Sequence, residues 1–295
     1  MKVFVIVRAD RPVVAAVGAI SVRLAVAGVP RPVGYNAKVP SSRAIDLLAD
    51  HLTPNARVTV LTGAGVSAAS GVPTFRGEEG LWKQHRPEQL ATPEAFARDP
   101  RLVWEWYDWR RQRIAACRPN RAHEVLAAWS ERYTDFTLIT QNVDGLHERA
   151  GTHNVLRMHG SIWEVACWTR CAGSPLRWRD ETVPLPVIPP RCSHCDGLIR
   201  PGVVWFGEAI EPGILMRCRE ATRCDVFLTI GTSAVVNPAA SLVQEAQERG
   251  AYTAEINLEA TPASSLVDHA LHGPAEIILA EVDERLGLLR GSGSR

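Results

Sequence analysis

The chain has 295 residues, of which 46% are hydrophobic, so it can bury a substantial core in one large domain with a smaller module. Its 33 lysines and arginines nearly balance its 32 aspartates and glutamates, and the formal net charge is +1. So balanced a chain has no overall field that would attract nucleic acid or an anionic membrane surface. We therefore expect neither nucleic acid nor a membrane as a partner.

The first 38 residues are apolar and poor in acidic side chains, and we predict a flexible extension over 1–38. Charged residues interrupt its apolar runs, so none reaches the roughly 20 residues that a membrane-spanning helix needs. A transit peptide and a misassigned start codon are the alternatives for this segment. We expect a cytoplasmic protein, with a flexible tail at 289–295.

From residue 41 onward, helical and strand patterns alternate. Serines precede the amphipathic run at 41–52, which predicts a capped helix, and the run RVTVLT at 57–62 predicts the first strand. Further strands are predicted at 135–140, 224–230, 251–257 and 275–280, with helices at 122–133 and 239–250. Such alternation is typical of an α/β fold with a doubly wound parallel sheet.

Small or polar residues follow the predicted strands, where ligands of a parallel sheet bind. They are GAGVS (63–67), QNVDG (141–145), GTSAVVNP (231–238) and NLEA (257–260). Gly63 and Gly65 would let the backbone approach a pyrophosphate closely. The spacing from these glycines to Gly71 does not fit GxGxxG, which argues against an ordinary hydride-transferring dehydrogenase.

Four cysteines form an independent pattern. Cys167 and Cys171 are separated by three residues, Cys192 and Cys195 by two, and 20 residues lie between the pairs. This zinc-ribbon spacing predicts one structural zinc ion in a small insert. Two disulfides in a secreted protein are the alternative, which would leave three of the seven cysteines as an odd set.

Several motifs follow one another in a single order: GAGVSAASGVPTFRG, TQNVDGLHERAG, LRMHG, the two cysteine pairs, RPGVVWFGE, GTSAVVNP and INLE. This order is the one found in sirtuins, the NAD-dependent protein lysine deacylases, and the chain resembles that family over about residues 42–285. The resemblance implies a Rossmann-like NAD-binding domain with an inserted zinc-ribbon domain. The implied boundaries are 39–160 and 206–288 for the NAD-binding domain, with a helical insert at about 78–118, and 161–205 for the zinc module.

The resemblance also implies which residues bind NAD. They are Gly63, Ala64, Ser67, Phe75, Arg76, Trp82, Gln141, Asn142, Val143, Asp144, Gly231, Thr232, Ser233, Asn257, Leu258, Glu259 and Ala275. In this assignment Phe75 lies on the nicotinamide side, and residues 141–144 surround the nicotinamide ribose. The residues from 231 onward contact the adenosine half.

Three residues are catalytic by the same resemblance: His159, Asn142 and Asp144. His159 would be the general base, taking a proton from a ribose hydroxyl after nicotinamide has left, so that 2'-O-acyl-ADP-ribose forms. An imidazole suits this role because its ordinary pKa of about 6.5 leaves it largely neutral near pH 7. From the residues alone, a histidine after a short apolar run is more often structural.

Substrate binding is assigned to two segments. In sirtuins the peptide adds as a strand to the segment that matches Val204, Trp205, Phe206 and Gly207, whereas the residues alone indicate a plain buried strand over 203–208.

The second segment is WEWYDWRR at 104–111, in which Tyr107 and Arg110 share a helix face. In sirtuins that act on succinyl-, malonyl- or glutaryl-lysine, a Tyr and an Arg at this spacing bind the distal carboxylate, and Thr74 supports that subgroup. Glu78 conflicts with it, since an inward carboxylate would repel an acidic acyl group. The alternative is a core tyrosine and a solvated arginine.

We therefore expect an NAD-dependent protein lysine deacylase that removes acetyl and also succinyl or malonyl groups, with acylated lysines of other proteins as partners. Its cofactors would be NAD and one zinc ion. The alternatives are a deacetylase only, a protein ADP-ribosyltransferase and a non-catalytic NAD sensor. A nucleic-acid-binding zinc ribbon is disfavoured by the balanced charge.

Overall fold

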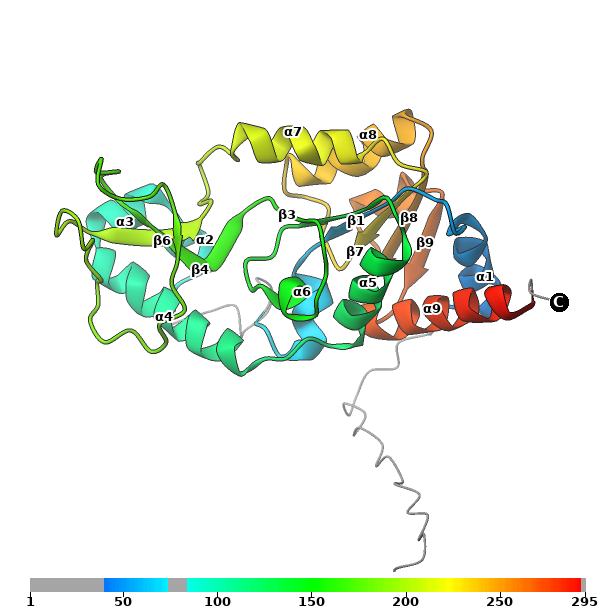
Figure 1. Ribbon diagram of the computed structural model, residues 1–295, viewed down its shortest axis with the longest axis horizontal. Coiled ribbons are helices and arrows are strands. Elements are labelled where there is room, and N and C mark those ends of the chain that lie inside the picture. The colour runs from blue at the N-terminus through cyan, green and yellow to red at the C-terminus, as the bar shows by residue number, and fades with distance from the viewer. Residues whose placement is uncertain (1–39, 74–83, 293–295) are drawn as a thin grey trace, which may run out of the picture. The chain divides into compact units, whose positions relative to one another are not determined.

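The computed structural model describes residues 40–73 and 84–292, with side-chain surroundings as far as residue 288 (Figure 1). The chain divides into two units, Met1–Asn36 and Ala37–Arg295, and all described residues belong to the second. The predicted extension at 1–38 therefore lies outside the described residues and stays a prediction.

The larger of the two described sheets is parallel and has six strands, in the order β3-β2-β1-β7-β8-β9. Its strands are β1 (Val58–Thr62), β2 (Phe136–Thr140), β3 (Val155–Arg157), β7 (Val226–Ile230), β8 (Tyr252–Asn257) and β9 (His269–His272). All five residues of β1 and of β7 are buried, as expected for strands covered on both faces. The chain runs outward from β1 to β3 and returns to β7 on the other side of β1, so the sheet's topological switch point lies between β1 and β7.

Helices cover both faces of this sheet (Figure 1). One face packs against α1 (Ser42–His51), α5 (Arg121–Arg132) and α9 (Ala275–Ser292), and the other against α7 (Pro212–Ala221) and α8 (Leu242–Glu248). The side chain of Ser41 caps α1 by accepting a bond from the Ala44 amide. The indole N–H of Trp129 donates to Asp283 over 3.0 Å and joins α5 to α9.

A second layer combines helices with a small antiparallel sheet. Its helices are α2 (Pro87–Leu90), α3 (Pro93–Arg98) and α4 (Pro100–Ala116), and its strands, in the order β5-β4-β6, are β5 (Trp178–Arg179), β4 (Gly160–Cys167) and β6 (Ile199–Val203). Side chains from all three helices and from β4 and β6 share one hydrophobic cluster. The helical insert and the cysteine-bearing module therefore pack as one body. Short helices η1 (Ala64–Ser70), α6 (Leu146–Arg149), η3 (Ala239–Ser241) and η4 (Pro262–Ser265) complete the described elements.

Most predicted elements are confirmed, and three expectations are wrong in part. Residues 275–280 begin helix α9 rather than a strand, because the buried positions Ile278, Leu279, Val282 and Leu286 continue a helical period beyond 280. The last strand is instead β9. The expected flexible tail at 289–295 is helical as far as residue 292.

The extended run expected over 203–208 also ends early. Strand β6 stops at Val203, and Phe206 and Gly207 form a turn in which Gly207 has φ +85°. A left-handed φ of this kind is the reason that a glycine suits the position.

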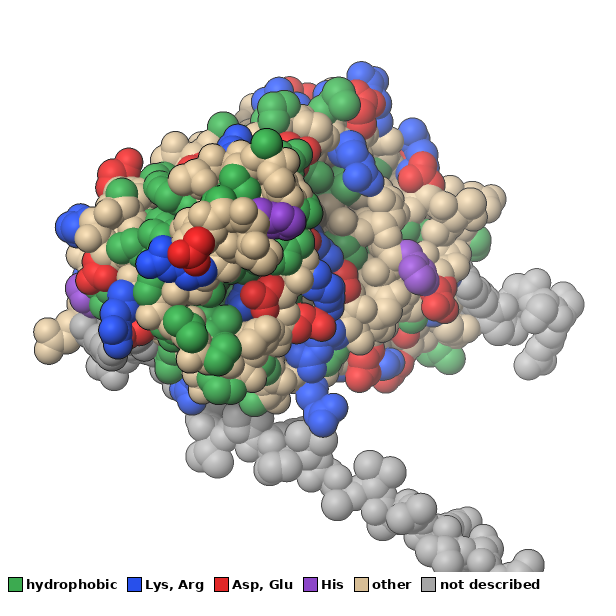
Figure 2. All heavy atoms as spheres, turned by 60° about the vertical axis from the view of Figure 1, so that its left-hand side comes forward, with side chains coloured by type: hydrophobic (Ala, Val, Ile, Leu, Met, Phe, Trp, Pro, Cys, Tyr) green, Lys and Arg blue, Asp and Glu red, His purple; other side chains and the backbone are tan. Residues whose placement is uncertain are grey.

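No described helix combines the length and apolarity needed to cross a membrane. On the face shown in Figure 2, acidic and basic side chains lie interspersed, in agreement with the balanced composition.

Candidate functional site

Two glycine-containing loops meet where β1 and β7 end. The amide of Gly63 donates to the Ile230 carbonyl over 3.0 Å, and the amide of Gly65 donates to the Gly231 carbonyl over 2.8 Å. Gly231 has φ +59°, and a Cβ there would lie 2.4 Å from the Val66 nitrogen. The close backbone contact therefore requires glycine and fixes both loops at the switch point.

Polar side chains from the loops after β1 and β2 form one buried hydrogen-bonded group. The Ser67 hydroxyl donates to Asp144 Oδ2 over 2.8 Å, and Asn142 Nδ2 donates to the Gly63 carbonyl over 3.1 Å and to the Ser67 hydroxyl over 3.3 Å. The Leu146 amide donates to Asp144 Oδ1 over 2.8 Å. Burial raises the pKa of Asp144, while the bonds from Leu146 and Ser67 oppose that rise.

His159 follows β3 and is half-buried beside this group. Its Nδ1 lies 3.0 Å from the Gln141 carbonyl oxygen, and the Gln141 side chain donates to the Thr232 hydroxyl over 2.8 Å. Asn257 Nδ2 in turn donates to the Thr232 carbonyl over 3.1 Å. Burial lowers the pKa of His159, and the Gln141 carbonyl partly offsets this. His159 is thus bonded directly to the loop after β2, which is linked through the loop after β7 to the loop after β8.

Two fully buried histidines lie beneath the site, and the sequence analysis did not identify them. His123 Nε2 is 3.3 Å from the Ser67 hydroxyl, which already donates to Asp144 and therefore accepts from His123. His147 Nε2 is 3.0 Å from the Thr62 hydroxyl, and the two imidazole centroids are 4.8 Å apart. Burial lowers the pKa of each histidine to about 3, so both are neutral supports for the loops.

The predicted NAD-binding residues fall into three groups. Direct hydrogen bonds connect Gly63, Ser67, Gln141, Asn142, Asp144, Thr232 and Asn257, and Gly231 joins them through its backbone contact with the first loop. The roles of Ala64, Val143, Ser233, Leu258, Glu259 and Ala275 stay predictions, although each lies in a loop or helix start at this edge of the sheet. Phe75, Arg76 and Trp82, together with Thr74 and Glu78, lie outside the described residues.

Tyr107 and Arg110 lie on α4, as the helical spacing predicts. The Tyr107 side chain is buried, its hydroxyl accepts a bond from Trp205 Nε1 over 2.9 Å, and burial raises its pKa to about 12. The Arg110 guanidinium lies 4.9 Å from the Trp106 ring centre, and burial lowers its pKa while Tyr107 and Asp144 oppose that shift. Its neighbour Arg111, which was not singled out, is fully buried and donates to the Ile162 carbonyl.

The predicted peptide-binding segment runs directly past His159. The Val204 amide donates to the His159 carbonyl over 2.9 Å, and the Phe206 amide donates to the Ala91 carbonyl over 2.9 Å. Trp205 is buried, whereas Phe206 and Gly207 are exposed. The segment therefore holds the histidine on one side and presents an accessible turn on the other.

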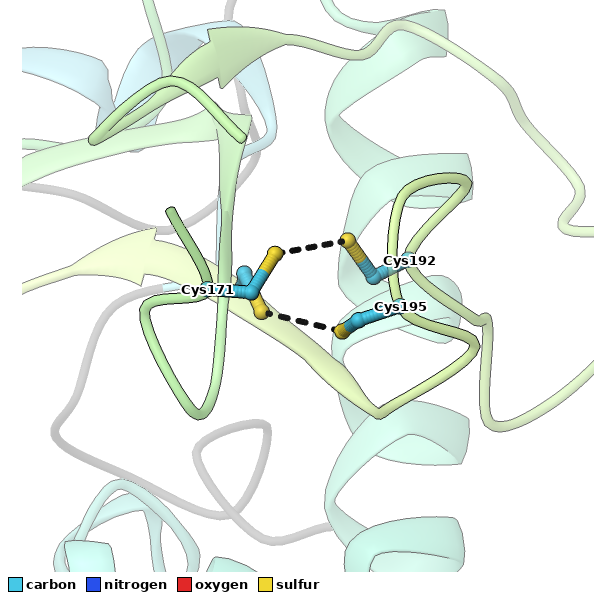
Figure 3. A group of neighbouring side chains, drawn as sticks. Cys171, Cys192 and Cys195 are labelled. Atoms are coloured by element: carbon cyan, nitrogen blue, oxygen red, sulfur yellow. Dashed lines mark hydrogen bonds between the residues drawn. The ribbon is translucent and has the colours of Figure 1, made fainter. Parts of the chain in front are cut away.

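The four cysteines come together at the ends of β4 and β6, and Figure 3 shows Cys171, Cys192 and Cys195 turned toward one another. All four sulfurs lie within 4.8 Å of one another, with separations of 3.8 Å for Cys167–Cys195 and for Cys171–Cys192. A tetrahedral zinc with Zn–S bonds of about 2.3 Å requires sulfur separations of about 3.8 Å. The cluster fits one zinc ion, and the cysteines are free rather than disulfide-bonded.

Comparison with known proteins identifies close relatives. A model of the Sir2 family matches residues 63–238. An NAD-dependent protein deacylase of Aquifex aeolicus is 50% identical over 239 residues, which cover 81% of this chain and 98% of that protein.

Solved structures match at similar levels. A Sir2 homologue in complex with NAD has a TM-score of 0.76 at 42% identity, covering 83% of this chain and 94% of that one. A mutant Sir2 homologue in complex with 2'-O-acetyl ADP-ribose has a TM-score of 0.75 at 41% identity, and the match covers 85% of this chain and 98% of that one. A Sir2–p53 peptide–NAD+ complex has a TM-score of 0.70 at 27% identity, and the match covers 83% of this chain and 99% of that one.

Proposed function

Because this chain belongs to the Sir2 family, we propose that it is an NAD-dependent protein lysine deacylase. In this reaction the acyl group of a modified lysine is transferred to ADP-ribose and nicotinamide is released. The relative that shares half of its residues carries this activity in its name, and a similar structure holds 2'-O-acetyl ADP-ribose. In this chain His159 contacts the Gln141 carbonyl in the loop after β2, at the carboxyl edge of the parallel sheet.

The orientation of His159 is the observation that carries the proposal. A carbonyl oxygen can only accept, so the contact with Gln141 places the imidazole proton on Nδ1 and leaves Nε2 unprotonated in the neutral ring. Burial lowers the pKa of His159 below its ordinary value and keeps the ring neutral near pH 7. His159 can then take a proton at Nε2 as a general base.

NAD, when bound, supplies the ADP-ribosyl group and the nicotinamide leaving group. We assign its binding to the loops after β1, β2, β7 and β8, which carry the hydrogen-bonded group described above. Ser67 and Asn142 are fixed by bonds to Asp144 and to the Gly63 carbonyl, so they would meet the ligand in set positions. Such preorganised polar groups lose little freedom on binding.

The acyl pocket we assign to α4, and we propose that it prefers an acidic acyl group such as succinyl or malonyl. Tyr107, with a pKa of about 12, stays protonated near pH 7. An arginine side chain carries only donors, so both side chains can donate. Two donors on one helix face suit a carboxylate, which only accepts. We infer that acylated lysines of proteins enter along the Val204–Gly207 segment.

The four cysteines would hold a structural zinc, which closes the module formed by β4, β5 and β6. The small sheet packs against α4 in a shared cluster, so the metal would stabilise the layer that carries the acyl pocket. It would take no part in the chemistry, because four thiolates leave no open coordination position.

The test is turnover of matched acetyl-lysine and succinyl-lysine peptides with NAD, followed by mass detection of products. We expect His159→Ala to abolish deacylation while NAD binding, measured by calorimetry, is largely kept. His153→Ala is the matched control, since His153 is exposed on the same segment and is expected to leave turnover unchanged. Turnover by His159→Ala within tenfold of wild type would contradict the role of the base.

A further inference from the structure

We propose that Trp205 is a specificity-determining residue whose indole N–H orients the Tyr107 hydroxyl as a donor toward the acidic end of the acyl group. The inference rests on the proposed function, because it concerns the acyl pocket of the same site. It adds a positioning role for a residue that the sequence analysis placed only in the peptide-binding segment.

The direction of the hydrogen bond sets what Tyr107 can do. An indole N–H can only donate, so the 2.9 Å contact makes the Tyr107 oxygen the acceptor. The phenolic proton must therefore point away from Trp205. With a pKa of about 12, Tyr107 keeps that proton throughout the neutral range. Tyr107 is thus fixed as a donor.

Arg110 lies one helical turn from Tyr107 and adds a cation to the same face. Each of the two groups influences the other's pKa, which places them within electrostatic reach. The face therefore combines an oriented O–H donor with a guanidinium, and a carboxylate is the ligand end that matches both. An acetyl group has no such end, so it gains nothing from the orientation.

Trp205 can orient Tyr107 because the indole is itself held on several sides. The Arg200 guanidinium lies 3.7 Å from the Trp205 ring centre, and Arg200 Nη2 donates to Glu208 Oε2 over 2.8 Å. The same Glu208 oxygen accepts from the Trp205 amide over 2.9 Å. Phe96 packs at 5.3 Å between ring centres. These contacts pack the indole on several sides.

Trp205 also links the peptide-binding segment to the acyl pocket. Its neighbours Val204 and Phe206 donate their backbone amides to the His159 and Ala91 carbonyls, whereas the Trp205 side chain donates to Tyr107 on α4. Loss of the N–H should therefore affect how the acyl end is recognised more than how the peptide backbone or the base is placed.

The experiment compares Trp205→Phe, Tyr107→Phe and the double variant. Trp205→Phe keeps an aromatic ring and removes the donor. We expect it to lower kcat/KM for the succinyl-lysine peptide about 3- to 10-fold more than for the acetyl-lysine peptide, mainly through KM. In the double variant the loss should not exceed that of Tyr107→Phe alone. Equal losses on both peptides, or additive losses in the double variant, would overturn the proposal.

Binding separates this inference from the proposed function. Calorimetric titration of both peptides in the His159→Ala background needs no turnover, and Trp205→Phe should weaken binding of the succinyl peptide alone. If wild type lacks deacylase activity, the proposed function fails while this titration still decides the role of Trp205. If Trp205→Phe does not fold, Glu208→Gln, which loosens the indole, should shift succinyl binding in the same direction. No shift with a folded Glu208→Gln protein would overturn the proposal.

Discussion

Replacing Arg110 with methionine tests the acyl preference most selectively. Arg110 projects from the same face of α4 as Tyr107, and its guanidinium lies over the Trp106 ring. Methionine keeps an unbranched chain that can pack on that ring, and it removes only the charge and the donors. The fold should be little affected, since burial already disfavours the charge, as the lowered pKa of Arg110 indicates.

The magnitude follows from the kind of bond that is lost. A hydrogen bond to a charged group in a buried site contributes about 1.5–3 kcal/mol. Each 1.4 kcal/mol corresponds to about a tenfold change in kcat/KM, so succinyl-lysine turnover should fall about 10- to 150-fold. Acetyl-lysine turnover should change little, because the acetyl group has no carboxylate to lose.

The assay is kcat/KM for the two peptides by product mass, for wild type, Arg110→Met and Arg113→Met. Arg113 is an exposed arginine on the same helix, stacked 5.8 Å from the Trp109 ring centre, and its replacement should leave both substrates unchanged. If Arg110→Met reduced both substrates equally, Arg110 would be structural. If wild type preferred acetyl-lysine, the acidic-acyl proposal would be wrong, and Glu78→Ala would then be expected to raise succinyl turnover.

Three further predictions concern the metal, a loop contact and pH. Purified protein should carry about one zinc per chain by metal analysis, and Cys192→Ser should lose both the metal and solubility; well-folded wild type without zinc would contradict this. Gly231→Ala should raise the KM for NAD and lower the free energy of unfolding by about 1–3 kcal/mol, because its Cβ would lie 2.4 Å from a backbone nitrogen. Gly250→Ala, at φ +88° with open space around it, is the control for backbone strain alone. The buried His123 and His147 have pKa values of about 3 when folded, against about 6.5 when unfolded, so the unfolded chain binds more protons between these values. The free energy of unfolding in urea should therefore decrease as pH falls from 6.5 toward 3, by up to about 1.4 kcal/mol per pH unit for each histidine, and a smaller slope in His147→Gln would confirm the source.

The central strands could be predicted because each is a short apolar run followed by a small or polar loop. The run at 275–280 failed for a physical reason: AEIILA suits a buried strand as well as a buried helix. The helix was decided by Val282 and Leu286, which lie beyond that window and extend the buried stripe. Local composition alone could not settle the choice.

The site was predicted where motifs lie within one loop and missed where contacts join distant segments. The four cysteines and the loop glycines have diagnostic spacing, so their meeting could be expected. The hydrogen bond between Tyr107 and Trp205 joins residues 98 positions apart, and no motif spacing in the sequence predicts it. His123 and His147 were missed because their neutral, buried state depends on the packing of α5 and α6. A signal existed in the motif QNVDGLH, where His147 follows Asp144 by three residues.

The central claim is that acyl transfer consumes NAD, and product stoichiometry tests it most directly. Purified protein is incubated with NAD and an acyl-lysine peptide, and nicotinamide, free-lysine peptide and acyl-ADP-ribose are quantified by mass spectrometry. We predict equal amounts of the three products with wild type, and neither free-lysine peptide nor acyl-ADP-ribose above background with His159→Ala, whose base acts only after nicotinamide has left. Nicotinamide release by wild type without deacylated peptide, or ADP-ribose attached to protein in place of acyl-ADP-ribose, would contradict the deacylase account.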